Sequence, residues 1–173
     1  MMNEVNVMDV TENKNMLLIT GIEDKLEQSI CHTASIRPEN TVILKSVFPH
    51  ISQPYSDLMR DIITLVFQKK IEEIFIVRSK NEEPADIDLD DFMLRNPHVS
   101  NKLQTIDYLF QNGNPKFPFS NLSEWLNGGK PVAVGIKQSV DLIRRHPLIP
   151  SHVKVRGFLI DTEHEVLTEI KAE

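Results

Sequence analysis

Residues 71–84 of this chain read IEEIFIVRSKNEEP, and this stretch determines how the rest of the sequence is organised. Ile74–Val77 is a short run of β-branched and aromatic residues, typical of a strand that is buried on both faces of a sheet. Polar residues begin at Arg78, so residues 78–83 are predicted to form a loop at the carboxyl end of a central strand. Open α/β sheets bind their ligands at this edge. The loop is rich in charge but contains no His or Cys, so it has the position of an active-site loop without the usual catalytic side chains.

Length, charge and cysteine content restrict the class of protein. A chain of 173 residues is long enough to bury a sizeable core, and we expect an N-terminal arm over residues 1–15 and a single domain over residues 16–173. The net charge of −6 argues against nucleic acid as a partner, because phosphate binding needs a basic face. No apolar run approaches the ~20 residues of a membrane span, and the polar N-terminus shows no secretory signal. A single cysteine, Cys31, rules out an internal disulfide and fits a reducing compartment, so a cytoplasmic protein without membrane insertion is predicted.

The pattern of apolar runs and helical periodicity predicts an α/β fold. Leu58, Ile62 and Val66 recur with helical spacing behind Ser56, a residue type that caps helices. Strands joined through helices imply a mainly parallel sheet of about four strands, with an antiparallel C-terminal strand and helices on both faces. The expected strands are residues 16–20, 41–44, 74–77, 153–159 and 166–170, and the main expected helices are residues 56–70 and 131–145.

Two segments near the C-terminus carry a family resemblance. Gln138–Pro150 reads QSVDLIRRHPLIP, and Val153–Asp161 reads VKVRGFLID. They resemble the β-class carbonic anhydrases of the compact bacterial and archaeal type, in which a Ser-Val helix is followed by a Pro-Leu-Ile bend and a Gly-aromatic-x-x-Asp strand. The resemblance extends from Met16 to Ile170 and implies the α/β fold of that family.

The motifs that hold zinc in the family are altered in this chain. There, a Cys-x-Asp-Ser-Arg motif follows the first strand and a His-x-x-Cys motif follows the central strand. Alignment at the strand ends puts Gly21 at the first Cys position, and Glu23, Asp24 and Lys25 at the Asp, Ser and Arg positions. In the second motif, the same alignment puts Lys80 at the His position and Glu83 at the Cys position.

The resemblance therefore predicts a protein without the catalytic zinc centre. A site of two thiolates and one imidazole needs two cysteines, and the chain has only Cys31, which we interpret as a small buried apolar side chain in a helix. Thiolates are the ligands that hold zinc in such a site, and bound zinc lowers the pKa of its water to ~7. Glycine offers no ligand atom, and the ammonium group of a lysine repels a cation.

The predicted function is that of a carbonic-anhydrase-like protein with no catalytic residue, metal or cofactor, which acts by binding, regulation or scaffolding. The resemblance implies a homodimer, and it suggests another protein of inorganic-carbon metabolism as a partner. The alternative function is an enzyme that reuses the pocket.

Two uses of the remaining charges stay open. Lys25, Arg78 and Lys80 either form an ion-pair network with Glu23 and Glu83 in place of the metal, or bind a small anion such as bicarbonate or phosphate. An enzyme that processes such an anion is one form of the alternative function.

A carboxylate-bound metal is the other form. Residues 82–91 offer oxygen ligands of the kind that magnesium and calcium prefer, although the glycine and the distal glutamate of a calcium-binding loop are absent. A solvated acidic loop or a docking surface for a protein is the simpler interpretation. The carboxylates concerned are Glu82, Glu83, Asp86, Asp88, Asp90 and Asp91.

Overall fold

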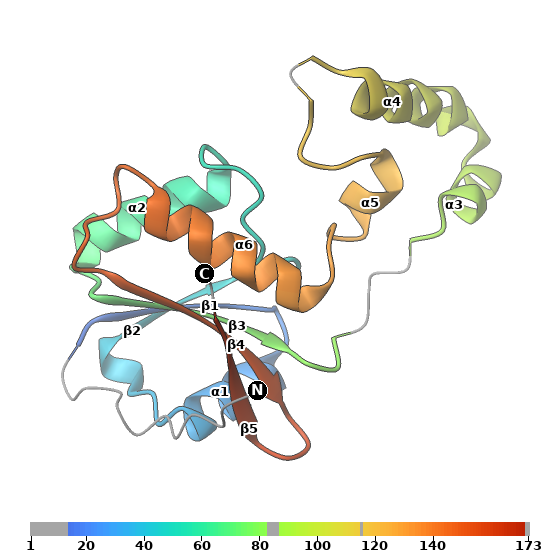
Figure 1. The fold of residues 1–173 in the computed structure, drawn as a ribbon. Coiled ribbons are helices and arrows are strands. Elements are labelled where there is room, and N and C mark those ends of the chain that lie inside the picture. The colour runs from blue at the N-terminus through green and yellow to red at the C-terminus, as the bar shows by residue number, and fades with distance from the viewer. Residues whose placement is uncertain (1–13, 83–86, 115, 172–173) are drawn as a thin grey trace. The chain divides into compact units, whose positions relative to one another are not determined.

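The computed structural model describes residues 14–82, 87–114 and 116–171. The chain divides into two compact units (Figure 1). The first combines the chain up to Glu82 with the part from Val132 onwards, and the second is the intervening segment, residues 83–131. The expectation that residues 16–173 behave as a single domain stays a prediction.

The first unit is built on a five-stranded sheet in the order β2-β1-β3-β4-β5. Neighbouring strands from β2 to β4 are parallel, and β5 is antiparallel to β4. This arrangement confirms the predicted α/β fold with its antiparallel C-terminal strand. The strands are β1 (Met16–Thr20), β2 (Thr41–Lys45), β3 (Glu73–Ser79), β4 (Lys154–Asp161) and β5 (Val166–Ile170).

Helices cover both faces of the sheet, as predicted. Helix α1 (Asp24–Thr33) lies on one face, and α2 (Asp57–Lys69) and α6 (Val132–Arg145) lie on the other (Figure 1). Because side chains alternate along a strand, each face of the sheet has its own apolar cluster. Leu17 and Ile19 of β1 pack on the α2 and α6 side, while Leu18 of β1 packs on the α1 side.

The boundaries of α2 follow from its sequence. The hydroxyl of Ser56 accepts a hydrogen bond from the backbone N–H of Met59 and so caps the helix. The buried residues Met59, Ile62 and Val66 lie on one face of this helix. Lys70 adopts the left-handed conformation with φ 52°, and the helix ends there.

Gly157 allows α6 to pack closely on β4. A Cβ atom at this position would lie 2.2 Å from Cγ2 of Ile136 and 3.0 Å from Cγ2 of Val140, both on α6. No side chain larger than a hydrogen fits without moving the helix. The glycine of the Gly-aromatic-x-x-Asp segment is therefore required for α6 to pack on β4.

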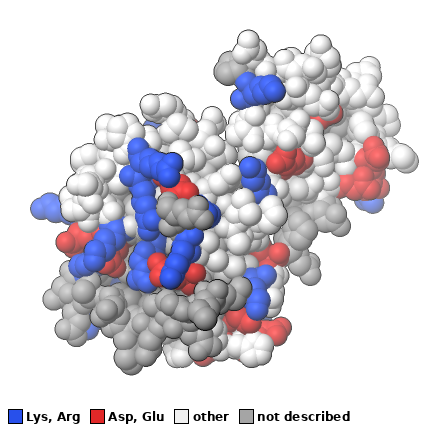
Figure 2. Space-filling model, in the orientation of Figure 1, with Lys and Arg blue, Asp and Glu red and all other residues white. Residues whose placement is uncertain are grey.

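Basic side chains gather on one face of the first unit. Figure 2 shows Lys and Arg side chains over α6 and the C-terminal strands. Helix α6 ends in the exposed residues Arg144 and Arg145, and Lys154 at the start of β4 is also exposed. The net charge of −6 is thus unevenly distributed over the chain.

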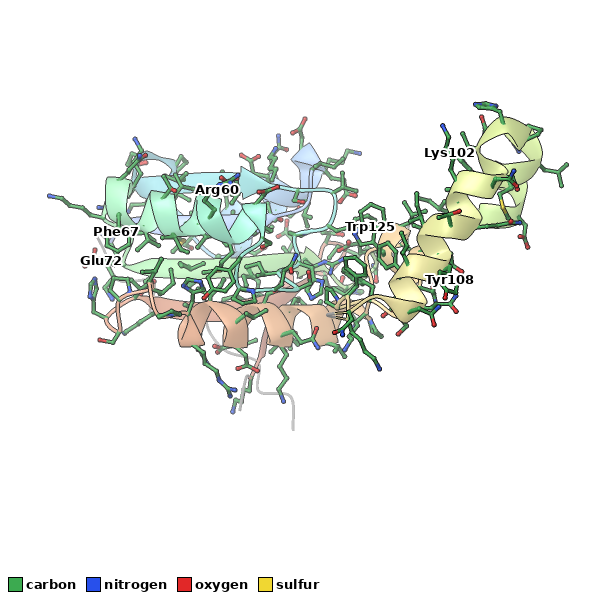
Figure 3. All side chains as sticks on the ribbon, turned by 90° about the horizontal axis from the view of Figure 1, so that it is seen from above. Arg60, Phe67, Glu72, Lys102, Tyr108 and Trp125 are labelled. Atoms are coloured by element: carbon green, nitrogen blue, oxygen red, sulfur yellow. The ribbon has the colours of Figure 1, made fainter. Side chains whose placement is uncertain are left out.

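The second unit contains short helices around a small aromatic cluster. The ring centroid of Phe110 lies 4.8 Å from that of Phe117 and 5.7 Å from that of Trp125. In Figure 3, Tyr108 and Lys102 project from α4, and Trp125 belongs to α5. The elements are α3 (Leu89–Arg95), a 3-10 turn (Pro97–Val99), α4 (Ser100–Asn112) and α5 (Leu122–Leu126). No helix in the described part of the chain is long and apolar enough to cross a membrane.

Candidate ligand site at the carboxyl edge of the sheet

A cavity of about 490 Å³ lies at the carboxyl edge of the sheet, where the sequence predicted a site. Its walls come from the start of α1, the end of β3 and the turn that follows β4. The cavity is lined by Glu23, Asp24, Lys25, Leu26, Ser29, Ser79 and Thr162, and apolar atoms make up most of its surface.

The segment predicted to replace the Asp-Ser-Arg residues forms the start of α1. Glu23 is the N-cap residue, and its carbonyl oxygen accepts hydrogen bonds from the N–H groups of Leu26 and Glu27. Asp24 forms an ion pair with Lys45 of β2 at 2.9 Å. Hydrogen bonds to Glu27 and to Asp24 raise the pKa of Lys45. Asp24 is therefore already bound to a neighbouring strand.

The end of β3 divides its side chains between the two faces of the sheet. Ser79 faces α1 and lines the cavity. Arg78 faces α6, where its Nη1 atom lies 3.4 Å from the position that a Cβ of Gly135 would take. Lys80 donates its backbone N–H to the carbonyl of Ile160 at 2.8 Å, and its side chain is largely exposed.

The three cations suggested as an anion site have different surroundings. Lys25 lines the cavity, but Arg78 and Lys80 do not. The guanidinium of Arg78 pairs with Glu82, and the ammonium of Lys80 lies 3.8 Å from a carboxylate oxygen of Asp161. The predicted network of these cations with Glu23 and Glu83 stays a prediction, because Glu83 lies outside the described residues.

A buried bidentate ion pair closes the other face of the strand end. Arg78 is 5% exposed. Its Nε donates to Oε2 of Glu82 at 2.9 Å, and its Nη2 donates to Oε1. Two parallel charge-assisted hydrogen bonds are a strong form of the Arg–carboxylate interaction.

Among the residues that the structure describes, those at this edge do not fit a zinc ion. Gly21 follows β1 and offers no ligand atom, and a Cβ built there would lie 3.2 Å from Cδ2 of Leu26. Cys31 lies near the end of α1 and packs against the apolar cluster on that face. Burial and the nearby Glu27 carboxylate raise the pKa of its thiol, which disfavours the thiolate that a metal needs. Glu83, the last predicted ligand position, lies outside the described residues.

The acidic stretch has a local structural role where the structure describes it. Asp88 caps α3 by accepting hydrogen bonds from the N–H groups of Asp90 and Asp91. Carboxylates in the first turn of a helix interact favourably with its dipole, and Asp91 also pairs with Arg95. Within the described ranges, no three His, Cys, Asp or Glu residues are grouped so that they could hold a metal ion. Glu83 and Asp86 lie outside those ranges.

Four residues that line the cavity were missed by the sequence analysis: Leu26, Ser29, Ser79 and Thr162. Of these, Ser79 lies at the end of the central strand. The signal was available in the alternation of side chains along β3, because Phe75 and Val77 belong to the apolar cluster on the α1 side. Ser79 continues this series, and Lys80 stands an even number of residues from Arg78, so the alternation assigns it to the other side. The Ser79 hydroxyl accepts a hydrogen bond from the N–H of Asn81 at 3.2 Å.

Known structures share this fold, and sequence comparison shows which family the chain belongs to. No family model matches the sequence. The β-carbonic anhydrase isoform I of Trichomonas vaginalis superposes with a TM-score of 0.69 at 16% identity, over 95% of this chain and 86% of that chain. A carbonic anhydrase of Streptococcus mutans gives a TM-score of 0.59 at 12% identity, over 95% and 89% of the two chains. These structures define the fold as that of the β-carbonic anhydrases.

The sequence itself is 38% identical over 154 residues to the carbonic anhydrase-like protein YbcF of Bacillus subtilis (strain 168). This match covers 89% of the chain and 85% of that protein. The chain belongs to the β-carbonic-anhydrase-like family.

Proposed function

We propose that this protein is a member of its family that does not hydrate carbon dioxide and acts instead by binding. The observation that carries the proposal is the cysteine count. The whole sequence contains Cys31 alone, and Cys31 lies in α1 with its side chain against the core. A centre with two thiolate ligands cannot be assembled within one chain from a single cysteine.

Metal analysis beside a hydration assay tests this proposal. The protein, purified without added metal, is expected to contain only trace zinc and to hydrate carbon dioxide no faster than buffer. Zinc approaching one ion per chain, together with activity that a chelator abolishes, would show that the chain builds a metal centre from other ligands. The control is the same protein incubated with zinc and then desalted, because a site that merely lost its metal would regain both properties.

The partner that we propose is an acidic segment of another protein, with proteins of inorganic-carbon metabolism as the first to be tested. The basic surface over α6 and the C-terminal strands in Figure 2 supports this choice. Exposed Arg144, Arg145 and Lys154 favour approach of a negatively charged partner. The proposal places the protein in the cytoplasm, since a lone cysteine fits a reducing compartment.

A second function is an enzyme that processes a small anion in the cavity on the α1 side. It is favoured by Lys25, which lines the cavity beside the hydroxyl-bearing residues Ser29, Ser79 and Thr162. Replacing Lys25 with methionine tests it, because binding of phosphate or bicarbonate in the cavity should then be lost. If anion binding is unchanged, the cavity is not the site.

A further inference from the structure

Arg78 is a buried cation on the central strand of the sheet. Strand β3 lies between β1 and β4, and all seven of its residues are buried. Arg78 is paired in register with Leu159 of β4, so its backbone is held by the sheet. A guanidinium in such a position needs an anion beside it, because an unpaired buried charge is strongly destabilising.

Glu82 supplies this anion from a loop. It follows the end of β3, and its backbone N–H reaches the carbonyl of Ser79 only at 3.4 Å. Its side chain is 18% exposed, against 6% for that of Arg78. The cation is thus fixed by the sheet, while the carboxylate comes from a more accessible segment.

On this face of the sheet the Arg78 guanidinium lies against α6 at Gly135. Gly135 faces it without a side chain, and a Cβ there would lie 3.4 Å from Nη1 of Arg78 and 3.5 Å from Cδ2 of His50. The Nε and Nη2 edge, which Glu82 occupies, is the edge that binds two coplanar oxygens.

We propose that Arg78 is the binding site for a small planar monoanion, either a carboxylate or bicarbonate, and that the Glu82 side chain occupies this site when no ligand is bound. Exchange of one carboxylate for another keeps the buried guanidinium paired at every stage. The exchange also releases the Glu82 side chain from Arg78. This inference names the class of ligand for the proposed binding function. It rests on that function, because a zinc centre at the end of β3 would leave no anion site there.

The test is Glu82→Gln, which removes the negative charge and keeps the size of the side chain. Sodium acetate and sodium bicarbonate are the probes, and sodium chloride at equal ionic strength is the reference. In chloride, the variant should melt at a lower temperature than the wild type. Acetate or bicarbonate should raise its melting temperature in a saturable way, with an affinity at least ~10-fold above that of the wild type, since a tethered carboxylate competes at millimolar or higher effective concentration.

Two controls assign the effect to Arg78. The double variant Arg78→Gln with Glu82→Gln has no charge at the site and should respond to acetate no more than to chloride. Glu169→Gln breaks a second bidentate pair, with Arg156, whose side chain is 26% exposed. Acetate should stabilise this variant much less. An equal response in the double variant would overturn the proposal, as would the absence of any response in folded Glu82→Gln.

A measurement on the wild type covers the case in which Glu82→Gln does not fold. The Arg78 Nε–H resonance in a nitrogen-15 spectrum should shift saturably during an acetate titration and stay in place during a chloride titration. A resonance that moves equally in both titrations would overturn the proposal. Zinc content and hydration activity are measured separately, so the anion site and the proposed lack of catalysis can fail independently.

Discussion

At the scale of single residues, the direction of each side chain at the end of β3 decides what the site contains. Ser79 and Lys80 are neighbours in sequence, but Ser79 lines the cavity beside Glu23 and Lys25, and Lys80 lies outside its lining. If the family's His-x-x-Cys spacing starts at the residue that faces the first loop, it falls on Ser79 and Glu82. A register one residue earlier is therefore a second hypothesis beside the alignment of the strand ends, which stays a prediction.

Two sets of substitutions separate these registers. The first is Gly21→Cys, Ser79→His and Glu82→Cys, with Arg78→Met added so that no buried charge is left unpaired. The second is Gly21→Cys, Lys80→His and Glu83→Cys. We expect the first set to bind zinc more tightly, because its imidazole faces the first loop. Residue 82 must also turn from the α6 face, where Glu82 pairs with Arg78, and Arg78→Met removes that pair. Cobalt(II) should give this set the stronger thiolate absorption band. Stronger binding by the second set would restore the register based on the strand ends.

Carbon dioxide hydration should stay slow in either set. Lys25 lacks the planar two-donor fork of an arginine, and Glu23 is one methylene longer than an aspartate. Errors around a metal site of this kind typically cost ~10–100-fold in affinity or activity. Adding Glu23→Asp and Lys25→Arg to the better set should raise turnover. Full activity without these additions would show that the two residues have no such role.

At the scale of elements, the contact between β4 and α6 is the least tolerant of change. Gly157→Ala should cost ~1–3 kcal/mol or more of the free energy of unfolding, because its methyl group would overlap Ile136. Gly135→Ala is the matched control on the other side of this interface. Its methyl group would make ordinary contacts with Arg78 at 3.4 Å and His50 at 3.5 Å, and alanine gains ~1 kcal/mol over glycine in a helix, so stability should be unchanged or rise by up to ~1 kcal/mol. Urea unfolding of both variants measures the difference, and equal losses would contradict the close approach at Gly157.

Most elements of the first unit could be predicted from sequence because their signals are local. Ser56 and the apolar spacing behind it gave α2 within one residue at each end. The run Ile74–Val77 gave the centre of β3, which extends over Glu73–Ser79. The pairing of Arg78 with Glu82 could not be predicted from sequence in this way. Which face of the strand a side chain occupies becomes clear only when the helices that cover each face are in place. Gly135 and Gly157 likewise look like ordinary glycines until α6 lies against them.

At the scale of the whole molecule, the structure changes the reason for expecting a homodimer. The sequence supports that expectation by resemblance and by the apolar run over residues 153–160, which reads as a surface in need of cover. In the structure this run lies in β4, which is covered by β3, β5 and α6 of its own chain. Two other features now support it. Strands β2 and β5 are the edges of the sheet, and unpaired edges are surfaces on which chains associate.

The second feature is the thin core of the segment from residue 83 to residue 131. Leu122 is its one buried residue among those described, whereas Leu94 is 82% exposed and Tyr108 is 66% exposed. So small a core needs further apolar cover, and we predict that a second copy of the chain provides it. Light scattering at micromolar concentration should give twice the chain mass of 19.9 kDa. Replacing Leu94 with aspartate should shift the protein towards the monomer, whereas Lys102→Ala in the same segment should not. A wild type that is monomeric under these conditions, or a Leu94 variant that dimerises as well as the wild type, would show that this segment is covered in some other way.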